Sequence, residues 1–66
     1  MNIQLNGETR DCATGTTITS LLHDEGLAER RVAVEVNGEI VPRSSHTNTP
    51  LHDGDRVEIV HALGGG

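Results

Sequence analysis

Two Asn-Gly pairs, at positions 6–7 and 37–38, limit most strongly what this chain of 66 residues can fold into. Asn and Gly both tolerate the positive φ angles that a tight turn between two antiparallel strands requires. Each pair follows a segment in which apolar and polar residues alternate, 1–5 before the first pair and 32–36 before the second. Such alternation is typical of a strand with one buried face. The sequence therefore predicts two β-hairpins.

The strands that complete the sheet differ in polarity. Residues 8–12, which return from the first turn, are mostly polar and suit an edge position. Residues 39–41 form a short strand that Pro42 ends, because proline cannot extend a ladder of backbone hydrogen bonds. After a turn at 53–55, residues 56–62 place apolar side chains on both faces of the last strand. The first and the last strand are the most apolar, although they lie far apart in the sequence.

One helix is predicted between the hairpins. Its apolar stripe has the spacing i, i+3 and i+4 and comprises Ile18, Leu21 and Leu22. The hydroxyl of Thr16 or Thr17 can cap the N-terminus, and Gly26 is a natural C-terminal cap. Leu27, just beyond the helix, is placed to pack back on its last turn. Residues 43–50 have no helical stripe, so we expect a loop there.

These elements favour one arrangement of the chain. If the first and the last strand pair in parallel in the middle of a mixed sheet, both are buried, and the helix then covers one face. The prediction is an α+β fold of the β-grasp (ubiquitin-like) type, with one main helix packed on one face of the sheet. Residues 1–63 are expected to form the β-grasp domain, and residues 64–66 a flexible glycine tail.

Composition and charge narrow the functional classes. With 33% apolar residues and no aromatic ones, a chain this short has no room for a deep pocket with a full catalytic set. The formal net charge of −5 and the lack of aromatic residues argue against nucleic-acid binding. Neither a signal peptide nor a membrane span is visible, so we expect a soluble cytoplasmic protein with no membrane partner. The single cysteine, Cys12, excludes an internal disulfide framework.

The side chains that often carry chemistry have simpler explanations here. Cys12 has no His or Asp in a recognisable arrangement with it, and we interpret it as a small buried hydrophobic residue. The histidines lie on different elements without the spacing of metal ligands, so no metal is expected. We interpret all of them as surface or edge residues: His23, His46, His52 and His61. The chain has no phosphate-binding loop, so any ATP site must lie on another protein.

The glycines at 64–66 are the most informative feature of the sequence. Glycine lets the backbone thread a narrow channel, and the α-carboxylate of Gly66 has no side chain beside it. A partner that supplies ATP and Mg²⁺ can convert such a carboxylate into a reactive acyl-adenylate, which sulfur or another nucleophile then attacks. Terminal glycines also occur in frayed ends, so the tail by itself leaves both interpretations open.

Three segments of the chain stand out as motifs: Val-Asn-Gly-Glu-Ile-Val-Pro-Arg at 36–43, Asp-Gly-Asp-Arg-Val-Glu-Ile-Val at 53–60 and Ala-Leu-Gly-Gly-Gly at 62–66. Together they resemble the ThiS family of bacterial sulfur carriers in thiamine biosynthesis. The resemblance extends over the whole chain. It implies a carrier that binds no cofactor, that is not itself a catalyst, and whose terminal carboxylate, on Gly66, becomes a thiocarboxylate. Gly64 and Gly65 correspond to the residues that thread the tail.

The same resemblance implies three partners. An E1-like adenylating enzyme (ThiF type) uses ATP and Mg²⁺ to activate Gly66, and a sulfur donor such as a cysteine desulfurase supplies the sulfur. A thiazole synthase (ThiG type) then takes that sulfur into the thiazole ring. Val60, Ala62 and Leu63 lie near the tail and are candidates for an apolar docking patch. Val60 and Ala62 are equally well explained as ordinary residues of a sheet.

Other functions are compatible with the same pattern. The small subunit of molybdopterin synthase, or another ubiquitin-like sulfur carrier, has the same fold and tail. A protein modifier would join its tail to a target amine, although this chain contains no lysine on which to build lysine-linked chains of itself. A plain interaction module would tolerate an added C-terminal residue, whereas a carrier would lose its function.

Overall fold

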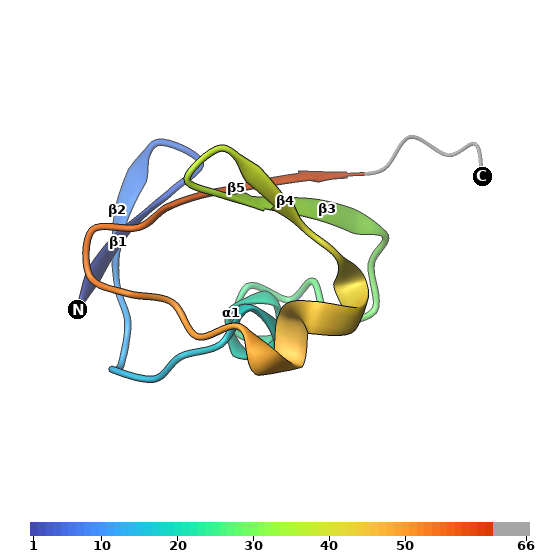
Figure 1. Ribbon diagram of the computed structural model, residues 1–66, viewed down its shortest axis with the longest axis horizontal. Coiled ribbons are helices and arrows are strands. Elements are labelled where there is room, and N and C mark those ends of the chain that lie inside the picture. Colours follow the sequence, from blue (N-terminus) through green and yellow to red (C-terminus); the bar gives the residue numbers. More distant parts are fainter. Residues whose placement is uncertain (62–66) are drawn as a thin grey trace.

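Figure 1 shows the computed structural model, in which residues 1–61 are described. The strands form one five-stranded sheet, and an α-helix and a 3₁₀ helix lie together on one side of it. In chain order the elements are β1 (Asn2–Leu5), β2 (Glu8–Asp11), α1 (Ile18–Asp24), β3 (Val32–Val36), β4 (Glu39–Val41), η1 (Arg43–Asn48) and β5 (Arg56–His61). The predicted order of hairpin, helix, hairpin and final strand is therefore confirmed.

The sheet has the strand order β2-β1-β5-β3-β4, which makes β5 its central strand. β1 and β5 pair in parallel, as predicted, with Gln4 beside Arg56 in the register. All other pairings are antiparallel, and that of β3 with β5 spans the whole of β3. Two parallel neighbours need a long crossover connection. Here the chain between β1 and β5 forms that connection, so strands from opposite ends of the sequence lie side by side.

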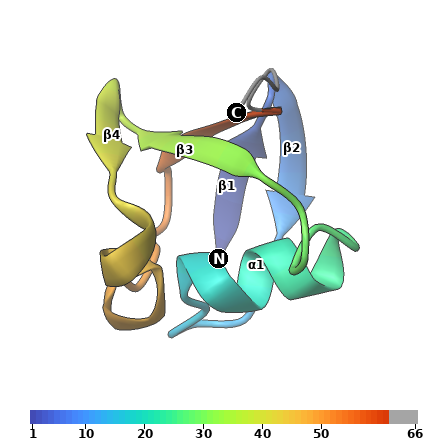
Figure 2. The ribbon, with the colours of Figure 1, turned by 90° about the vertical axis from the view of Figure 1, so that its right-hand side faces the viewer.

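The core lies between the sheet and the helices (Figure 2). Its sheet residues come from alternate positions of β1, β3 and β5, since successive side chains of a strand point to opposite faces. The buried apolar residues are Ile3, Leu5, Ile18, Leu21, Leu22, Val34, Leu51, Val57 and Ile59. Full burial of one such side chain contributes about 1.5–3 kcal/mol, so a small core without aromatic rings depends on each of them.

The ends of α1 are stabilised as the sequence predicts. Thr17 is the N-terminal cap, and its side chain accepts a hydrogen bond from the backbone N of Ser20 at 3.1 Å. Beyond the last turn, Gly26 has a φ of 74°, a left-handed conformation that favours glycine. The backbone N of Leu27 then donates to the carbonyl oxygen of Leu22 at 2.7 Å, and Leu27 packs against the core. This is the Schellman ending of a helix.

The segment after β4 differs from the predicted loop at 43–50. Residues Arg43–Asn48 form a 3₁₀ helix, which has three residues per turn and therefore shows no 3.6-residue stripe in the sequence. The prediction that His46 lies at the surface is also wrong, because this residue is only 5% exposed. Its Nε2 lies 3.0 Å from the carbonyl oxygen of Val41, so an Nε2–H group donated to that oxygen allows the ring to be buried. The other histidines are exposed, as predicted: His23, His52 and His61.

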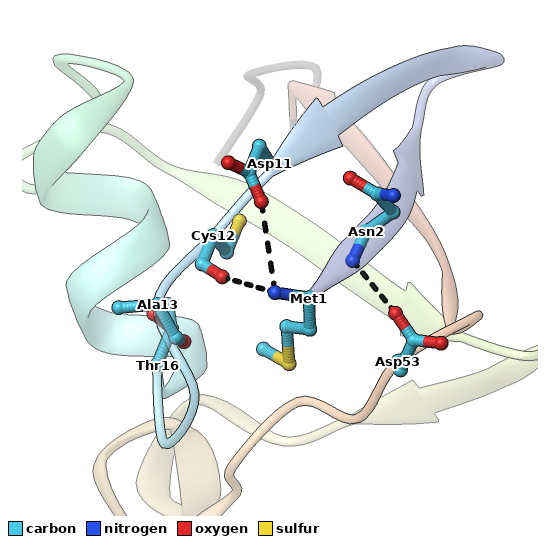
Figure 3. A network of polar contacts seen from close by, with 7 residues as sticks. All are labelled: Met1, Asn2, Asp11, Cys12, Ala13, Thr16 and Asp53. Atoms are coloured by element: carbon cyan, nitrogen blue, oxygen red, sulfur yellow. Dashed lines mark hydrogen bonds and ion pairs between the residues drawn. The ribbon is translucent and has the colours of Figure 1, made fainter.

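The N-terminal strand is fixed by polar contacts on both sides (Figure 3). The N-terminal amine of Met1 donates to the carbonyl oxygen of Cys12 at 2.8 Å and lies 3.6 Å from a carboxylate oxygen of Asp11. On the other side, the backbone N of Asn2 donates to Oδ1 of Asp53 at 2.8 Å. Cys12 packs against the core, as expected of a small hydrophobic residue, but it is half-buried and not fully enclosed.

Candidate functional site

The predicted site begins on β5. Val60 is 55% exposed, whereas its neighbours Val57 and Ile59 are buried, so Val60 lies on the face of the sheet that points away from the core. The description of β5 ends at His61, so the predicted end of this strand at 62 and the division between domain and tail lie outside the described residues. The same holds for the remaining predicted site residues: Ala62, Leu63, Gly64, Gly65 and Gly66.

Asn6 holds the middle of β5 in the sheet. The register between β1 and β5 ends at Val57. Beyond that point the side chain of Asn6 continues the contact, because its Oδ1 accepts a hydrogen bond from the backbone N of Ile59 at 2.8 Å. Asn6 has a φ of 49°, which is the left-handed conformation of a hairpin turn. One residue therefore forms the turn and extends the ladder of hydrogen bonds along β5.

Asn37 fixes the start of β5 in a similar way. Its Oδ1 accepts from the backbone N of Arg56 at 2.9 Å, and its own backbone N donates to the carbonyl oxygen of Arg56 at 2.7 Å. Its Nδ2 donates to Oδ1 of Asp55 at 3.0 Å. The sequence pattern explains Asn6 and Asn37 by their turns alone and does not reveal these contacts. The one signal is the choice of Asn at both turns, since Gly or Asp also suits that position.

The sheet face opposite the core has a distinctive set of side chains. We call it the outer face, and it includes Ala33, Glu35, Ile40, Arg56, Glu58 and Val60. In the register of the strands, Glu58 lies opposite Glu35, and Glu35 lies opposite Ile40. Val60 lies opposite Ala33. Within residues 1–61, two large apolar side chains are exposed to solvent: Ile40 at 70% and Val60 at 55%.

Other features of residues 1–61 offer no further chemistry. No group of three or more His, Cys, Asp or Glu side chains in this part of the chain is placed to hold a metal ion. Two surface hollows, beside η1 and beside β1, have volumes of about 190 and 310 Å³, at or below the lower end for pockets that enclose small ligands. No helix within the described residues is both long and apolar enough to cross a membrane.

A mixed five-stranded sheet with one α-helix on one face, whose central strand is the last in the sequence, defines a small ubiquitin-like β-grasp protein. The crystal structure of a thiamine biosynthesis protein (ThiS) from Geobacter metallireducens shares this fold. It is 36% identical and aligns with a TM-score of 0.87 over 100% of both chains. The sequence profile of the ThiS family matches residues 3–66. The chain belongs to the ThiS family, as its sequence motifs predict.

Two curated relatives indicate what this membership means. The sulfur carrier protein ThiS of Bacillus subtilis is 40% identical over 65 residues, which are 97% of this chain and 98% of that protein. The thiazole synthase of Paramagnetospirillum magneticum is 46% identical over 66 residues, but the chain spans only 20% of that protein's length. The chain is a sulfur carrier of thiamine biosynthesis, and it is a carrier protein and not an enzyme.

Proposed function

We propose that the α-carboxylate of Gly66 is the group that this carrier loads with sulfur. A carboxylate oxygen attacks the α-phosphate of ATP, pyrophosphate leaves, and an acyl-adenylate forms. Sulfur at the oxidation level of sulfide then attacks the acyl carbon, and AMP leaves. The product is a thiocarboxylate, in which one sulfur has replaced one oxygen. The observation that supports this assignment is the family match, which extends through Gly66.

The proposal places the nucleotide site and the source of sulfur on other proteins. An E1-like adenylating enzyme of the ThiF type supplies ATP and Mg²⁺. A donor such as a cysteine desulfurase supplies the sulfur as a persulfide, and a thiol reductant provides the two electrons that bring this sulfur to the oxidation level of sulfide. A thiazole synthase of the ThiG type accepts it. This last partner is supported by the thiazole synthase of Paramagnetospirillum magneticum, which contains a segment 46% identical to this chain. Because adenylation consumes ATP, the proposed compartment is the cytoplasm.

Each residue near the end of the chain receives a role in this proposal. Gly64 and Gly65 thread the channel of the enzyme, since a channel just wide enough for backbone excludes a residue with a Cβ atom. Val60, Ala62 and Leu63 form an apolar segment that contacts the enzyme around the channel entrance. The support for Val60 is its 55% exposure on a strand whose other apolar side chains, Val57 and Ile59, are buried.

Intact mass spectrometry tests the assignment to Gly66. The untagged protein is first weighed alone, to establish that Gly66 carries the free carboxylate. It is then incubated with ATP, Mg²⁺, the ThiF-type enzyme, a sulfur donor and a thiol reductant, and a reaction without ATP is the control. The expected result is the mass gain of one oxygen exchanged for one sulfur, located on Gly66 by fragmentation.

Two outcomes of this experiment contradict the proposal. The first is an unchanged mass when the same enzyme preparation loads another ThiS protein. The second is a covalent adduct between the carboxylate of Gly66 and an amine of another protein, which indicates a protein modifier.

A further inference from the structure

The two Asn-Gly pairs form equivalent turns, so the same chemistry is open to both. Asn6 and Asn37 have φ angles of 49° and 53°, and the glycines that follow them have φ angles of 84° and 86°. Each asparagine donates its backbone N–H to a carbonyl oxygen of β5, Asn6 to Val57 at 2.9 Å and Asn37 to Arg56 at 2.7 Å. All four turn residues are exposed to water. The chain therefore contains two copies of one local structure.

An asparagine followed by glycine can lose its side-chain amide without an enzyme. The glycine nitrogen gives up its proton and attacks Cγ of the asparagine, a C–N bond forms, and the Nδ2 group leaves as ammonia. Water then opens the resulting succinimide ring at one of its two carbonyl groups. The products are aspartate and isoaspartate, and in isoaspartate the main chain runs through Cβ and Cγ. Glycine favours the attack because it has no Cβ atom to hinder the approach.

Two features that favour this reaction are common to both turns. Apart from the chain neighbours, no atom lies within 4 Å of the place where Gly7 or Gly38 would carry a Cβ atom, so both glycines border open space. The Oδ1 atom of each asparagine also accepts a hydrogen bond from a backbone N of β5, that of Ile59 at 2.8 Å and that of Arg56 at 2.9 Å. Such a donor stabilises the negative charge that develops on this oxygen during the attack. These shared features predict equal rates at the two sites.

One contact distinguishes the two asparagines. Nδ2 of Asn37 donates to Oδ1 of Asp55 at 3.0 Å, whereas Nδ2 of Asn6 has no hydrogen-bond partner among residues 1–61. Asp55 is itself held in place, since its side chain is only 13% exposed and its Oδ2 accepts from the backbone N of His52 at 2.8 Å. To turn toward Gly38, the Asn37 side chain must break a charge-assisted hydrogen bond that Asn6 lacks. The nearby carboxylate also opposes negative charge on the Asn37 amide.

We propose that Asn6 is a site of spontaneous deamidation in the folded chain, and that Asp55 protects the otherwise equivalent Asn37. Conversion of Asn6 to isoaspartate lengthens the main chain of the turn and displaces the oxygen that accepts from the backbone N of Ile59. Because the register of β1 with β5 ends at Val57, loss of this contact loosens the hold of the first hairpin on the following part of β5. The modification needs neither an enzyme nor a loaded tail, so it is independent of the proposed function.

Peptide mapping measures both deamidation rates in one sample. The untagged protein is aged at mildly alkaline pH and digested with trypsin, which cleaves after arginine and so separates peptide 1–10 from peptide 32–43. A sample digested without ageing gives the background, and fragmentation distinguishes Asn6 from Asn2 in the first peptide. In the folded chain we expect Asn6 to convert at least about tenfold faster than Asn37, because one fewer hydrogen bond to a charged group must break. In urea the two rates should agree within about twofold, since glycine follows both residues.

Two substitutions test the protective role of Asp55. Asp55→Asn removes the charge and preserves the shape, so the rate at Asn37 is expected to rise at least about fivefold while Asn6 keeps its rate within about twofold. Glu39→Gln removes an exposed charge beside the same turn and should leave both rates within about twofold. An unchanged rate at Asn37 in Asp55→Asn overturns this role. Equal acceleration at Asn6 and Asn37 also overturns it, because it reports general loosening of the fold.

Hydrogen exchange tests the consequence for β5. Deamidation adds a negative charge, so anion exchange separates the aged chain from the unmodified one. In the isoaspartate form the Ile59 amide is expected to exchange at least about tenfold faster, with a lower urea midpoint, because its acceptor has moved. Asn6→Asp keeps the main chain of the turn and is the control, with a much smaller change. The proposal is overturned if folded Asn37 converts as fast as Asn6, if Asn6 is stable while the unfolded chain converts, or if exchange at Ile59 is unchanged.

Discussion

The two faces of the sheet use the same strands for different purposes. Toward the helices, Val34, Val57 and Ile59 of β3 and β5 are at most 7% exposed, and Val32 and Val36 of β3 pack against the core as partly buried residues. On the outer face, the intervening positions include Glu58, which is exposed, and Val60, which is 55% exposed. Because successive residues of a strand point to opposite faces, a step of one residue separates a position that stabilises the fold from one that a partner can contact. Substitutions one residue apart on the same strand should therefore differ sharply in their effect on stability.

The largest expected effect comes from breaking the core side of β5. Ile59→Ala removes a buried side chain and is expected to cost about 2–5 kcal/mol, which is most of the stability that a domain of this size has. Val60→Thr, one residue further on, keeps the β-branched shape and is expected to change stability by less than about 0.5 kcal/mol. Urea unfolding followed by far-UV circular dichroism measures both, since the chain has no aromatic residue for fluorescence. Similar losses in the two variants contradict the division between the faces.

The next largest effect is expected in η1, which together with α1 covers the core-facing side of the sheet. His46→Ala removes a ring that is 5% exposed and leaves the carbonyl oxygen of Val41 without its hydrogen bond, at a cost of about 2–3 kcal/mol. His23→Ala, at an exposed position of α1, is the matched control and should cost less than about 0.5 kcal/mol. Thermal unfolding of both variants measures the difference. If His46→Ala is as stable as His23→Ala, that result contradicts a buried His46 ring that is hydrogen-bonded to Val41.

A smaller effect tests how β5 is held in place. Asn6→Gly keeps a residue that tolerates positive φ but removes the acceptor for the backbone N of Ile59, so we expect a loss of about 1–2 kcal/mol. Asn6→Asp retains an oxygen at that position and should lose less than about 1 kcal/mol. Hydrogen exchange at the Ile59 amide is the specific measurement. It should accelerate in the glycine variant and much less in the aspartate variant, whereas equal rates in the two contradict this role of Asn6.

The smallest effect is expected at the edge of the sheet. Arg10 on β2 donates from Nη1 to Oε2 of Glu25 at 2.9 Å, which connects the edge strand to the end of α1. Both side chains are partly exposed, so Arg10→Gln should cost only about 0.2–1 kcal/mol. The cost should fall as salt is raised, and Arg30→Gln, in an exposed position, is the control. Unfolding curves at low and high salt test this, and a cost that salt does not change argues against an ionic origin.

The topology could be predicted from the sequence because its signals are local. Alternation along 1–5 and 32–36 identifies strands, and the Asn-Gly pairs identify the turns between them. The parallel pairing of β1 with β5 follows from the apolar character of both strands, since only a central position buries them. The caps of α1 at Thr17 and Gly26 also depend on neighbouring residues alone.

The features that the sequence did not reveal depend on register or on irregular structure. The 3₁₀ helix Arg43–Asn48 has no recognisable apolar period, so nothing in the sequence indicated that His46 turns inward. The side-chain contact from Asn6 to Ile59 joins residues that are 53 positions apart. The opposition of Glu35 and Glu58 likewise appears only when the register of β3 with β5 is known. The chemical role of Gly66 could be predicted from the sequence only as far as family resemblance extends.

In the proposed function, a stable domain presents the Gly66 carboxylate to an enzyme that loads it with sulfur. Its most direct test measures the mass gain after the loading reaction in three chains: the wild type, a chain without Gly66, and a chain with one alanine added after it. We expect the oxygen-to-sulfur mass gain in the wild type alone, with the same urea midpoint in all three chains. Loading of the extended chain, or loss of folding on removal of Gly66, would contradict it.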